Sequence, residues 1–328
     1  MSVSASEVTQ RRSGILSTLF SSSIIGPVAA LILAIIFFAT QTNKFLTGTN
    51  FSLIVQQVMV VGTLAIGQTL VILTSGIDLS NGAVMALGSV IMTSLAVDYG
   101  VNPFLAVLLG ILVCVLFGLL NGTLITLIRL PPFIVTLGTL NIAFALTHIY
   151  TSQTITGLPP FITFFGNTFR VGATAITYGS VLVVLLYLFV WFVLRSTPGG
   201  RYIYAVGDNP EAARLAGIST TRLLIAVYSI AAFSYGIAAL LLAARTGVGD
   251  PQAGQDDNLN SITAVVLGGT SLFGGRGNIL GTLIGALIVG VFRNGLTLMG
   301  ISTLYQSLIT GILVIAAVSI DQLSHRNK

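Results

Sequence analysis

Charged residues are scarce in this chain of 328 residues. Only 7% of its residues are Asp, Glu, Lys or Arg, whereas 54% are hydrophobic. An ordinary soluble domain carries about 25% charged residues, so a soluble fold of this length would lack the charges to cover its surface. The apolar residues also come in long runs separated by short polar stretches. This pattern is typical of membrane-spanning helices, and we predict an all-α integral membrane protein.

Cysteine and histidine are also nearly absent. Cys114 is the only cysteine, which excludes an intramolecular disulfide and a cysteine cluster. The two histidines, His148 and His325, are too few and too far apart to indicate a metal site. We interpret Cys114 and His148 as packing or helix-contact residues, and we expect no metal and no cofactor in this chain.

Enzyme motifs are missing as well. A phosphate-binding loop requires GxxxxGK[ST], and neither lysine, Lys44 or Lys328, follows such a glycine run. There is no GxSxG or HExxH motif, and no series of embedded carboxylates that would form a proton relay. We therefore predict no catalytic residues and no ATPase of the chain's own. Energy for any transport is then expected from a partner at the cytoplasmic face.

Ten apolar runs predict ten membrane spans, mostly of the length that a bilayer requires. They cover residues 23–40, 52–73, 79–97, 103–127, 133–151, 176–194, 223–244, 262–273, 279–292 and 303–320, of which the eighth and ninth are short. Arg11 and Arg12 precede the first run without a convincing cleavage site, so we predict an uncleaved first helix. The predicted organisation is a cytoplasmic segment 1–22, a transmembrane domain 23–320 and a cytoplasmic tail 321–328.

The placement of arginine and lysine predicts the orientation. With the N-terminus in the cytoplasm, ten basic residues fall in inside segments and four fall outside. The positive-inside rule favours this arrangement, and an even number of spans places both termini in the cytoplasm.

Two glycine-rich breaks interrupt the apolar runs. One is residues 268–278 (GGTSLFGGRGN), which includes Gly274 and Gly275, and the other is residues 74–82 (TSGIDLSNG). Such backbone does not form a stable lipid-facing helix, and it is tolerated at membrane depth only where protein or water satisfies its polar groups. The breaks indicate either an internal repeat around a pathway or tight turns between close-packed helices, and the sequence leaves both open.

Asp78 lies inside the first break, beside Ser80 and Asn81. A carboxylate within a membrane segment is costly and often functional. The alternative is a structural role, in which Asp78 or Ser80 caps the third helix by accepting its free backbone N–H groups. Both roles are compatible.

Two longer loops are expected on the outer side. Residues 152–175 carry a GLPP sequence and several aromatic residues. Residues 246–260 hold Asp250, Asp256 and Asp257, whose spacing does not match a calcium-binding loop. We favour a solvated acidic surface over a calcium site. Docking of a soluble partner is a further alternative.

The largest inside segment is residues 195–222. Asn209 and Pro210 predict the start of a short helix, with Asp208 or Asn209 as its cap and Pro210 at its first position. Glu211 lies in the first turn, where a negative charge is favourable, and Gly217 is expected to end the helix. This short helix is predicted to expose one face. The arginines of the segment also suit anionic lipid headgroups.

These residues resemble a known family. The sequences LVILTSGIDLS (70–80), GRYIYAVGDNPEAARLAGI (200–218) and AVVLGGTSLFGGRGNILGTLIGALI (264–288), together with NGL at 294–296, are similar to the permease subunits of bacterial ATP-binding cassette (ABC) importers for monosaccharides. That group takes up ribose, xylose, arabinose or fructose. The resemblance extends over residues 50–321.

The resemblance implies partners for this chain. Two permease copies form the pore, an ABC ATPase subunit binds below each copy, and a periplasmic sugar-binding protein delivers the ligand from above. Glu211, Ala212, Ala213 and Gly217 match the EAAxxxG pattern of the segment that docks into the ATPase. The downstream I-x-L-P of the longer pattern is absent. A bacterial inner-membrane location is implied, and no nucleic-acid partner is expected.

The resemblance also implies transport by alternating access, with ligand selectivity largely outside this chain. Pathway or gating positions are hypotheses at this point. They are Asp78, Ser80, Asn81, Gly274, Gly275 and Asn294. The alternative function is a self-contained secondary sugar transporter or channel. Related permeases that carry branched-chain amino acids or a signalling furanone leave the solute open.

Overall fold

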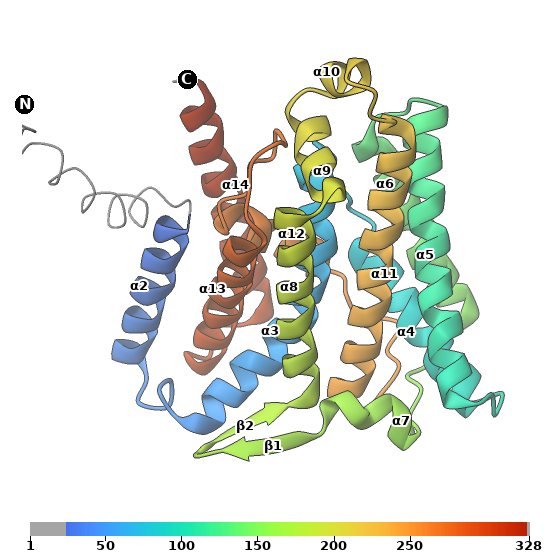
Figure 1. The fold of residues 1–328 in the computed structure, drawn as a ribbon. Coiled ribbons are helices and arrows are strands. Elements are labelled where there is room, and N and C mark those ends of the chain that lie inside the picture. Colours follow the sequence, from blue (N-terminus) through green and yellow to red (C-terminus); the bar gives the residue numbers. More distant parts are fainter. Residues whose placement is uncertain (1–23, 327–328) are drawn as a thin grey trace, which may run out of the picture.

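The computed structural model describes residues 24–326 of the chain, and the predicted cytoplasmic segment 1–22 lies outside the described residues. The described part is a bundle of helices with one small β-hairpin (Figure 1). Its elements are α2 (Ile25–Gln41), α3 (Gly48–Leu73), α4 (Asn81–Val97), α5 (Pro103–Leu127), α6 (Pro132–Tyr150), α7 (Pro160–Thr163), η1 (Phe164–Gly166), β1 (Thr168–Val171), β2 (Thr174–Thr177), α8 (Tyr178–Ser196), α9 (Pro198–Asp208), α10 (Pro210–Leu215), α11 (Thr220–Thr246), α12 (Asp257–Leu267), α13 (Ile279–Leu298) and α14 (Thr303–Arg326).

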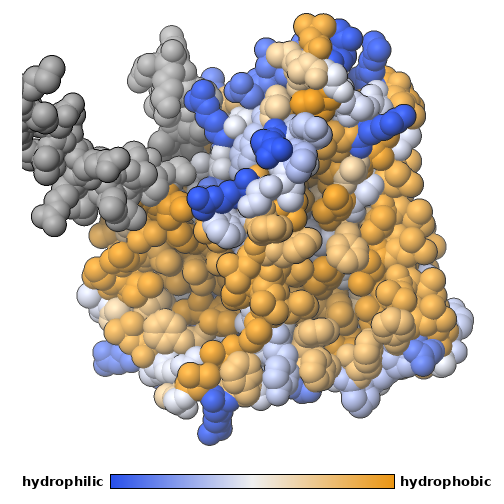
Figure 2. All heavy atoms as spheres, in the orientation of Figure 1, coloured by the Kyte–Doolittle hydropathy of each residue, from blue (hydrophilic) through white to orange (hydrophobic). Residues whose placement is uncertain are grey.

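Six of the described helices are long and apolar enough to cross a membrane, namely α3, α5, α6, α8, α11 and α13. Two further apolar helices, α2 and α4, are shorter, with 17 residues each. Hydrophobic residues cover the middle of the face shown in Figure 2, and hydrophilic residues gather at its two ends. The chain is therefore an all-α membrane protein, as predicted, whereas the count of ten spans and the orientation remain predictions.

The eighth and ninth predicted spans differ from the structure. The helix of the eighth span, α12, has only 11 residues and ends at Leu267, so residues 268–273 do not continue it. The ninth was predicted to end at residue 292, but α13 continues to Leu298 and has 20 residues. Arg293 and Asn294 interrupted the apolar run in the sequence. In the structure Asn294 is buried and Arg293 pairs with Asp257 at 3.6 Å, so the helix passes through both.

The two ends of the bundle have different character (Figure 1). The β1–β2 hairpin lies at one end, here called the hairpin end, and α10 lies at the other, called the α10 end. The described chain begins at the α10 end with α2 and returns to it with α14. This is consistent with the prediction that both chain ends lie on the side of residues 195–222.

Two groups of four helices pack in the same way with opposite directions. In the first group, α4 packs against α5 and α6, and in the second, α12 packs against α13 and α14. The first helix of each group packs against the other group. Thus α3 contacts α12 and α13, and α11 contacts α4 and α5. Because α3 runs toward the α10 end and α11 runs away from it, the groups α3–α6 and α11–α14 form an inverted repeat.

The two glycine-rich breaks are not equivalent positions of this repeat. Residues 74–80 connect the first and second helices of their group, and the equivalent connection in the second group is residues 247–256. The other break, residues 268–278, connects the second and third helices, so its counterpart is residues 98–102. The two breaks are alike in glycine content, but they occupy different positions in the repeat.

The core lies along α3 and α11. In the most apolar stretch of α3, 83% of the residues are buried, against 28% in α5 and α6, so α3 is central and the latter two helices are peripheral. At the other side of α3, α2 packs on α13 through the ring contact of Phe38 with Phe292, whose centroids are 5.4 Å apart.

Several elements were not predicted from the sequence, namely α7, η1, β1, β2 and α9. Within the expected loop 152–175, β1 pairs antiparallel with β2, and the backbone N–H of Ala175 donates to Ser52 Oγ at 2.8 Å. The sixth span therefore begins at Tyr178, after the strand, with Thr177 as its cap. Inside residues 195–222, α9 is a helix of its own, which begins with Pro198 at its first turn after the cap Thr197.

Candidate functional site

The N-terminal ends of α4 and α12 meet inside the bundle. Asn81, the first residue of α4, donates through Nδ2 to Gln68 Oε1 at 3.0 Å and to Ser261 Oγ at 2.8 Å. Asn258, in the first turn of α12, donates through Nδ2 to the carbonyl of Leu79 at 3.2 Å. Asn81, Gln68 and Ser261 are fully buried. Side-chain amides and hydroxyls therefore hold the two inverted groups together at this point.

Backbone contact closes this meeting point. A Cβ atom on Gly82 would lie 2.4 Å from the carbonyl oxygen of Gly254, and a Cβ on Gly254 would lie 2.6 Å from the carbonyl oxygen of Gly82. The contact is reciprocal, as expected for equivalent parts of an inverted repeat. A side chain on either residue would force the two segments apart.

Asp78 is fully buried beside this meeting point. Its Oδ1 accepts hydrogen bonds from the backbone N–H of Ser80 at 2.8 Å and from Ser80 Oγ at 2.6 Å, and its Oδ2 accepts one from Tyr235 O–H at 3.2 Å. Asn121 Nδ2 adds a donor to Ser80 Oγ at 3.2 Å. The carboxylate thereby ties the break after α3 to α11, while Asn121 adds α5.

The capping role predicted for Asp78 or Ser80 is wrong. Ser80 is the N-cap residue of α4, and its side chain makes no capping hydrogen bond. Asp78 bonds the N–H of Ser80 itself, which precedes the helix, and not the free N–H groups of the first turn. The hydroxyl of Ser80 instead donates to Asp78 Oδ1 and accepts from Asn121 Nδ2.

The meeting point of α4 and α12 is the first junction between distant segments. A second junction lies at the α10 end of α3. Ser75 has a left-handed backbone, with φ of 61°, and its Oγ lies 2.9 Å from the carbonyl oxygen of Gly207 and 2.8 Å from that of Phe273. The N–H of Gly275 donates to the carbonyl of Leu73 at 3.0 Å. Three segments therefore converge here: the end of α3, the turn that contains Gly274 and Gly275, and the end of α9.

The backbones pack closely at this junction. A Cβ on Gly207 would lie 1.8 Å from the carbonyl oxygen of Leu73 and 2.6 Å from the amide nitrogen of Gly275. Tyr204, one helical turn earlier in α9, donates its hydroxyl to the carbonyl of Gly277 at 3.0 Å. α9 therefore contacts both α3 and the turn before α13 directly.

The short helix α10 follows α9 without a linker. Of the two predicted caps, Asp208 and Asn209, the structure selects Asn209. Its Oδ1 accepts from the N–H groups of Glu211 at 3.1 Å and Ala212 at 2.9 Å. Ala213 is buried, whereas Glu211 and Ala212 are exposed. Gly217 ends the turn with φ of 88°, in the left-handed region that favours glycine. The segment is therefore one capped helical turn that exposes Glu211 and Ala212 and buries Ala213.

Glu211 pairs with Arg214 on the exposed face of α10. Arg214 Nη2 donates to Glu211 Oε1 at 2.5 Å, and its Nε donates to Oε2 at 3.1 Å. The guanidinium holds the pKa of the Glu211 carboxyl below its ordinary value through these hydrogen bonds and through its charge. The helix therefore keeps its first-turn negative charge at neutral pH, which its dipole favours.

The structure places Asn294 away from both junctions. It was expected just past the ninth span, but it lies within α13 and is buried. Its Oδ1 has no hydrogen-bond partner among the described residues. Asp78, Ser80 and Asn81 therefore share one site, Gly274 and Gly275 belong to the second junction, and Asn294 stands apart.

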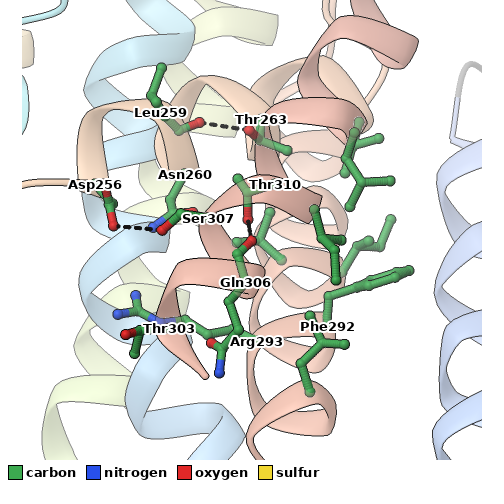
Figure 3. A pocket seen from close by; sticks show the side chains of 16 residues that line it. Asp256, Leu259, Asn260, Thr263, Phe292, Arg293, Thr303, Gln306, Ser307 and Thr310 are labelled. Carbon is green, nitrogen blue, oxygen red and sulfur yellow. Dashed lines mark hydrogen bonds between the residues drawn. The ribbon is translucent and has the colours of Figure 1, made fainter. Parts of the chain in front are cut away.

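Two cavities flank the start of α12. One, of about 330 Å³, lies between α4, α6 and residues 251–258. The other, of about 110 Å³, lies between α12, α13 and α14 (Figure 3). In the second cavity, Ser307 Oγ donates to Asp256 Oδ2 at 3.2 Å, and Arg293 and Gln306 also line the wall.

The acidic loop does not converge on a cation. Asp257 pairs with Arg293, Asp256 accepts from Ser307, and Asp250 Oδ1 accepts the backbone N–H of Gln252. No group of three or more potential metal ligands occurs among the described residues. His148 contacts Gln252 at 3.0 Å and Phe144 in the same helix, and Cys114 is buried. Both residues therefore make the helix contacts that the sequence predicted.

Comparison with known proteins decides the family. Residues 50–318 match the family model described as the permease component of the branched-chain amino acid transport system. The chain belongs to this permease family. No solved structure matches it.

The permease is similar along most of its length to several sugar importers. It is 48% identical over 311 residues to the fructose import permease of Rhizobium meliloti, a match that covers 93% of this chain and 86% of the relative. It is 41% identical over 301 residues to the ribose import permease of Bacillus subtilis, with 91% and 92% covered. The D-allose permease of Escherichia coli K12 is 36% identical, with 90% of both chains covered. The predicted resemblance is confirmed.

Several residues of the site were missed in the sequence. Gln68, Asn121 and Ser261 lie at the first junction, and Ser75 and Tyr204 lie at the second. Gln68 and Asn121 carried a signal, because each is an amide within a long apolar helix, where a polar side chain requires a partner. No such signal marked Ser75 and Tyr204, because polar side chains are common in the segments that contain them.

Proposed function

We propose that this permease is the membrane subunit of an ATP-driven importer for a monosaccharide such as fructose or ribose. The observation that carries the proposal is the continuous connection from the exposed helix α10, through α9, to the backbone of α3 and of the turn before α13. The fructose and ribose permeases among its relatives support the solute class.

The proposed docking site for the ABC ATPase subunit is α10. Three features support it: the helix stands at the tip of the molecule (Figure 1), it is capped at both ends, and it exposes Leu215 with 75% of its surface accessible. An exposed leucine beside the charged pair Glu211 and Arg214 offers an apolar anchor with a polar rim. The I-x-L-P that follows this segment in the longer family pattern is absent here, so the contacts beyond Gly217 differ.

Alternating access then follows from the second junction. The ATPase moves α10 and α9, and Gly207 transfers this movement to Leu73 and Gly275 because no side chain separates their backbones. The break after α3 and the turn before α13 move together. Since Asp78 and Asn81 follow the same break, the meeting point of α4 and α12 is the proposed gate.

The remaining partners complete the importer. A second permease copy, one ATPase subunit for each copy and a periplasmic sugar-binding protein at the hairpin end form the proposed assembly in the bacterial inner membrane. Arg195, Arg201, Arg214, Arg222 and Arg276 belong to segments at the α10 end, which supports a cytoplasmic position for that end and contact with anionic lipid.

The test is sugar uptake into proteoliposomes that contain the permease together with its ATPase and binding protein. We expect uptake of labelled D-fructose or D-ribose that requires ATP and both partners. Gly217→Pro and Glu211→Arg are expected to leave insertion intact and to abolish the coupling between ATP hydrolysis and uptake. Gly100→Pro is the matched control, because Gly100 also has a positive φ and open space around it, but belongs to another loop.

Two results would contradict the proposal. Uptake by the permease alone, without ATP, would indicate a secondary transporter or channel. Wild-type coupling between ATP hydrolysis and uptake in both the Gly217→Pro and Glu211→Arg variants would show that α10 is not the docking site. This conclusion would hold even if the wild type took up sugar with ATP.

A further inference from the structure

A line of polar side chains enters the bundle from the hairpin end. Gln252, Gln255, Asn258 and Ser261 stand at every third position of the segment that becomes α12. Gln252 Nε2 lies 3.0 Å from His148 Nε2, Gln255 Nε2 donates to Gln252 Oε1 at 2.7 Å, and Ser261 Oγ donates to the carbonyl of Asn258 at 2.8 Å. The line runs from exposed residues to the buried bond between Ser261 and Asn81.

The larger cavity lies beside this line. Its walls are α4, with Ala83 and Ala86, and α6, with Asn141 and Phe144, and Gln255 and Asn258 close its third side. Its volume is about 330 Å³, and none of the described residues that line it carries a charge. The second cavity differs, because Asp256 and Arg293 line it.

Asn141 places a polar side chain in the wall of this cavity. It lies in the middle of the 19-residue α6, and its side chain is exposed. Its Nδ2 donates to the carbonyl of Leu137 at 2.9 Å, which leaves Oδ1 as an acceptor. Exposure of this oxygen to lipid would cost free energy, because lipid offers no hydrogen bond. Polar residues at membrane depth normally face a protein interior or an aqueous cavity.

We propose that the cavity between α4, α6 and residues 251–258 is a water-filled subsite that binds the hydroxyl groups of a passing monosaccharide. This inference rests on the proposed function and gives the sugar a location. Amide side chains both donate and accept hydrogen bonds, as sugar hydroxyls do, and Phe144 supplies an apolar face.

The absence of charged side chains from the cavity wall suits a site through which a sugar passes without tight binding. Hydrogen bonds between neutral groups are about half as strong as those to ionised groups, so the sugar is held weakly. Gly254 lines the cavity and contacts Gly82 at the start of α4. Separation of α4 from residues 251–258 would open this contact.

Cysteine accessibility tests the subsite without relying on transport. The chain has a single native cysteine, Cys114, which is fully buried. The wild-type protein therefore gives the background labelling. Asn141→Cys is compared with Ile142→Cys, because Ile142 is also exposed but lies about 100° around the same helix. The probe is the charged, membrane-impermeant reagent 2-sulfonatoethyl methanethiosulfonate, applied to the permease in membranes.

We expect the thiol of the Asn141→Cys variant to react at least tenfold faster than that of the Ile142→Cys variant. The transported sugar, D-fructose or D-ribose, should slow the reaction of the Asn141→Cys variant at least threefold. Raffinose, a trisaccharide, is the osmotic control and should give no protection.

Two outcomes of this labelling would overturn the proposal. Equal reactivity of the Asn141→Cys and Ile142→Cys variants would show that water does not enter the cavity. The other outcome is fast labelling of the Asn141→Cys variant without protection by a sugar that the wild type imports. It would show that the sugar does not bind in the cavity.

Substitution of the polar line provides a second measurement. Gln255→Leu and Asn258→Leu are expected to reduce uptake at least fivefold, whereas Gln153→Leu, an exposed glutamine that does not line the cavity, should have no effect. Wild-type uptake by both cavity variants would contradict a role in passage. If the wild type imports no sugar at all while the Asn141→Cys variant remains reactive, the proposed function fails, and this result is distinct from a failure of the cavity.

Discussion

Gly207→Ala places a methyl group between three backbone segments. The new Cβ would lie 1.8 Å from the carbonyl oxygen of Leu73 and 2.6 Å from the nitrogen of Gly275. Ordinary contact begins at 3.4 Å, so the carbonyl would have to retreat by 3.4 − 1.8, or about 1.6 Å. Such a shift also breaks the hydrogen bond from Gly275 N–H to Leu73, which is 3.0 Å long.

The expected loss of stability follows from these two effects. Overpacking of a tight site costs about 1–3 kcal/mol, and a lost hydrogen bond adds about 1 kcal/mol. We therefore expect a destabilisation of about 2–4 kcal/mol. Soluble domains of 150–250 residues lose about 2–4 °C of Tm per kcal/mol, and longer chains lose less, so we expect the Tm to fall by a few degrees.

Thermal unfolding in detergent with a thiol-reactive fluorogenic dye measures this loss. The dye reports unfolding directly, because Cys114 is the only cysteine and is fully buried in the folded protein. Gly199→Ala is the matched control in the same helix, since its new Cβ would contact only Thr197 Oγ1 at 3.7 Å. Alanine is the better helix former, so this control should be neutral or slightly stabilised. Equal Tm values for the two variants would refute the close packing of α9 against α3.

Three further predictions concern single side chains. Asn209→Ala should increase hydrogen exchange at the amides of Glu211 and Ala212 without a change in global Tm, because a lost cap costs about 0.5–2 kcal/mol locally; unchanged exchange would contradict the cap. Asp78→Leu should lower the Tm far more than Asp78→Asn in the dye assay, since leucine leaves three donors without an acceptor, at about 1–3 kcal/mol each; similar Tm values would refute the network. The carboxyl of Glu211 should titrate below its ordinary pKa of 4.5, so its pairing with Arg214 is complete above that value and is lost as the pH falls through the lowered pKa. Carbon-13 labelling of glutamate measures this titration, because the chain has only one other glutamate, Glu7, and a midpoint at or above 4.5 in low salt would contradict the pairing.

Local features of the chain were predicted well. Pro103–Leu127 begins and ends as the apolar run predicted, and Asn209, Pro210 and Gly217 bound the short helix as their backbone preferences indicated. These features depend on residues within one or two helical turns of each other. Hydropathy and capping preferences contain that information.

Long-range contacts were not accessible in the same way. Asn81 and Ser261 are 180 positions apart, and nothing in either local sequence specifies the other. The positions of the two glycine-rich breaks in the repeat were not accessible for a related reason. Glycine content reflects how closely backbones approach, whereas position in the repeat depends on the order and direction of the helices. Ser75 shows the limit most clearly, since its left-handed backbone is set by the two segments that its hydroxyl joins.

The inverted repeat has a consequence for stoichiometry. Duplication with inversion turns one copy of the four-helix group upside down, so the two copies of any surface face opposite sides of the membrane. The α9–α10 segment connects the two groups and occurs once in the described chain, at one end only. The described part of a single chain therefore offers a partner on that side one α9–α10 segment and no equivalent second one. Under the proposed function, two ATPase subunits that each bind one α10 helix would require two copies of this chain.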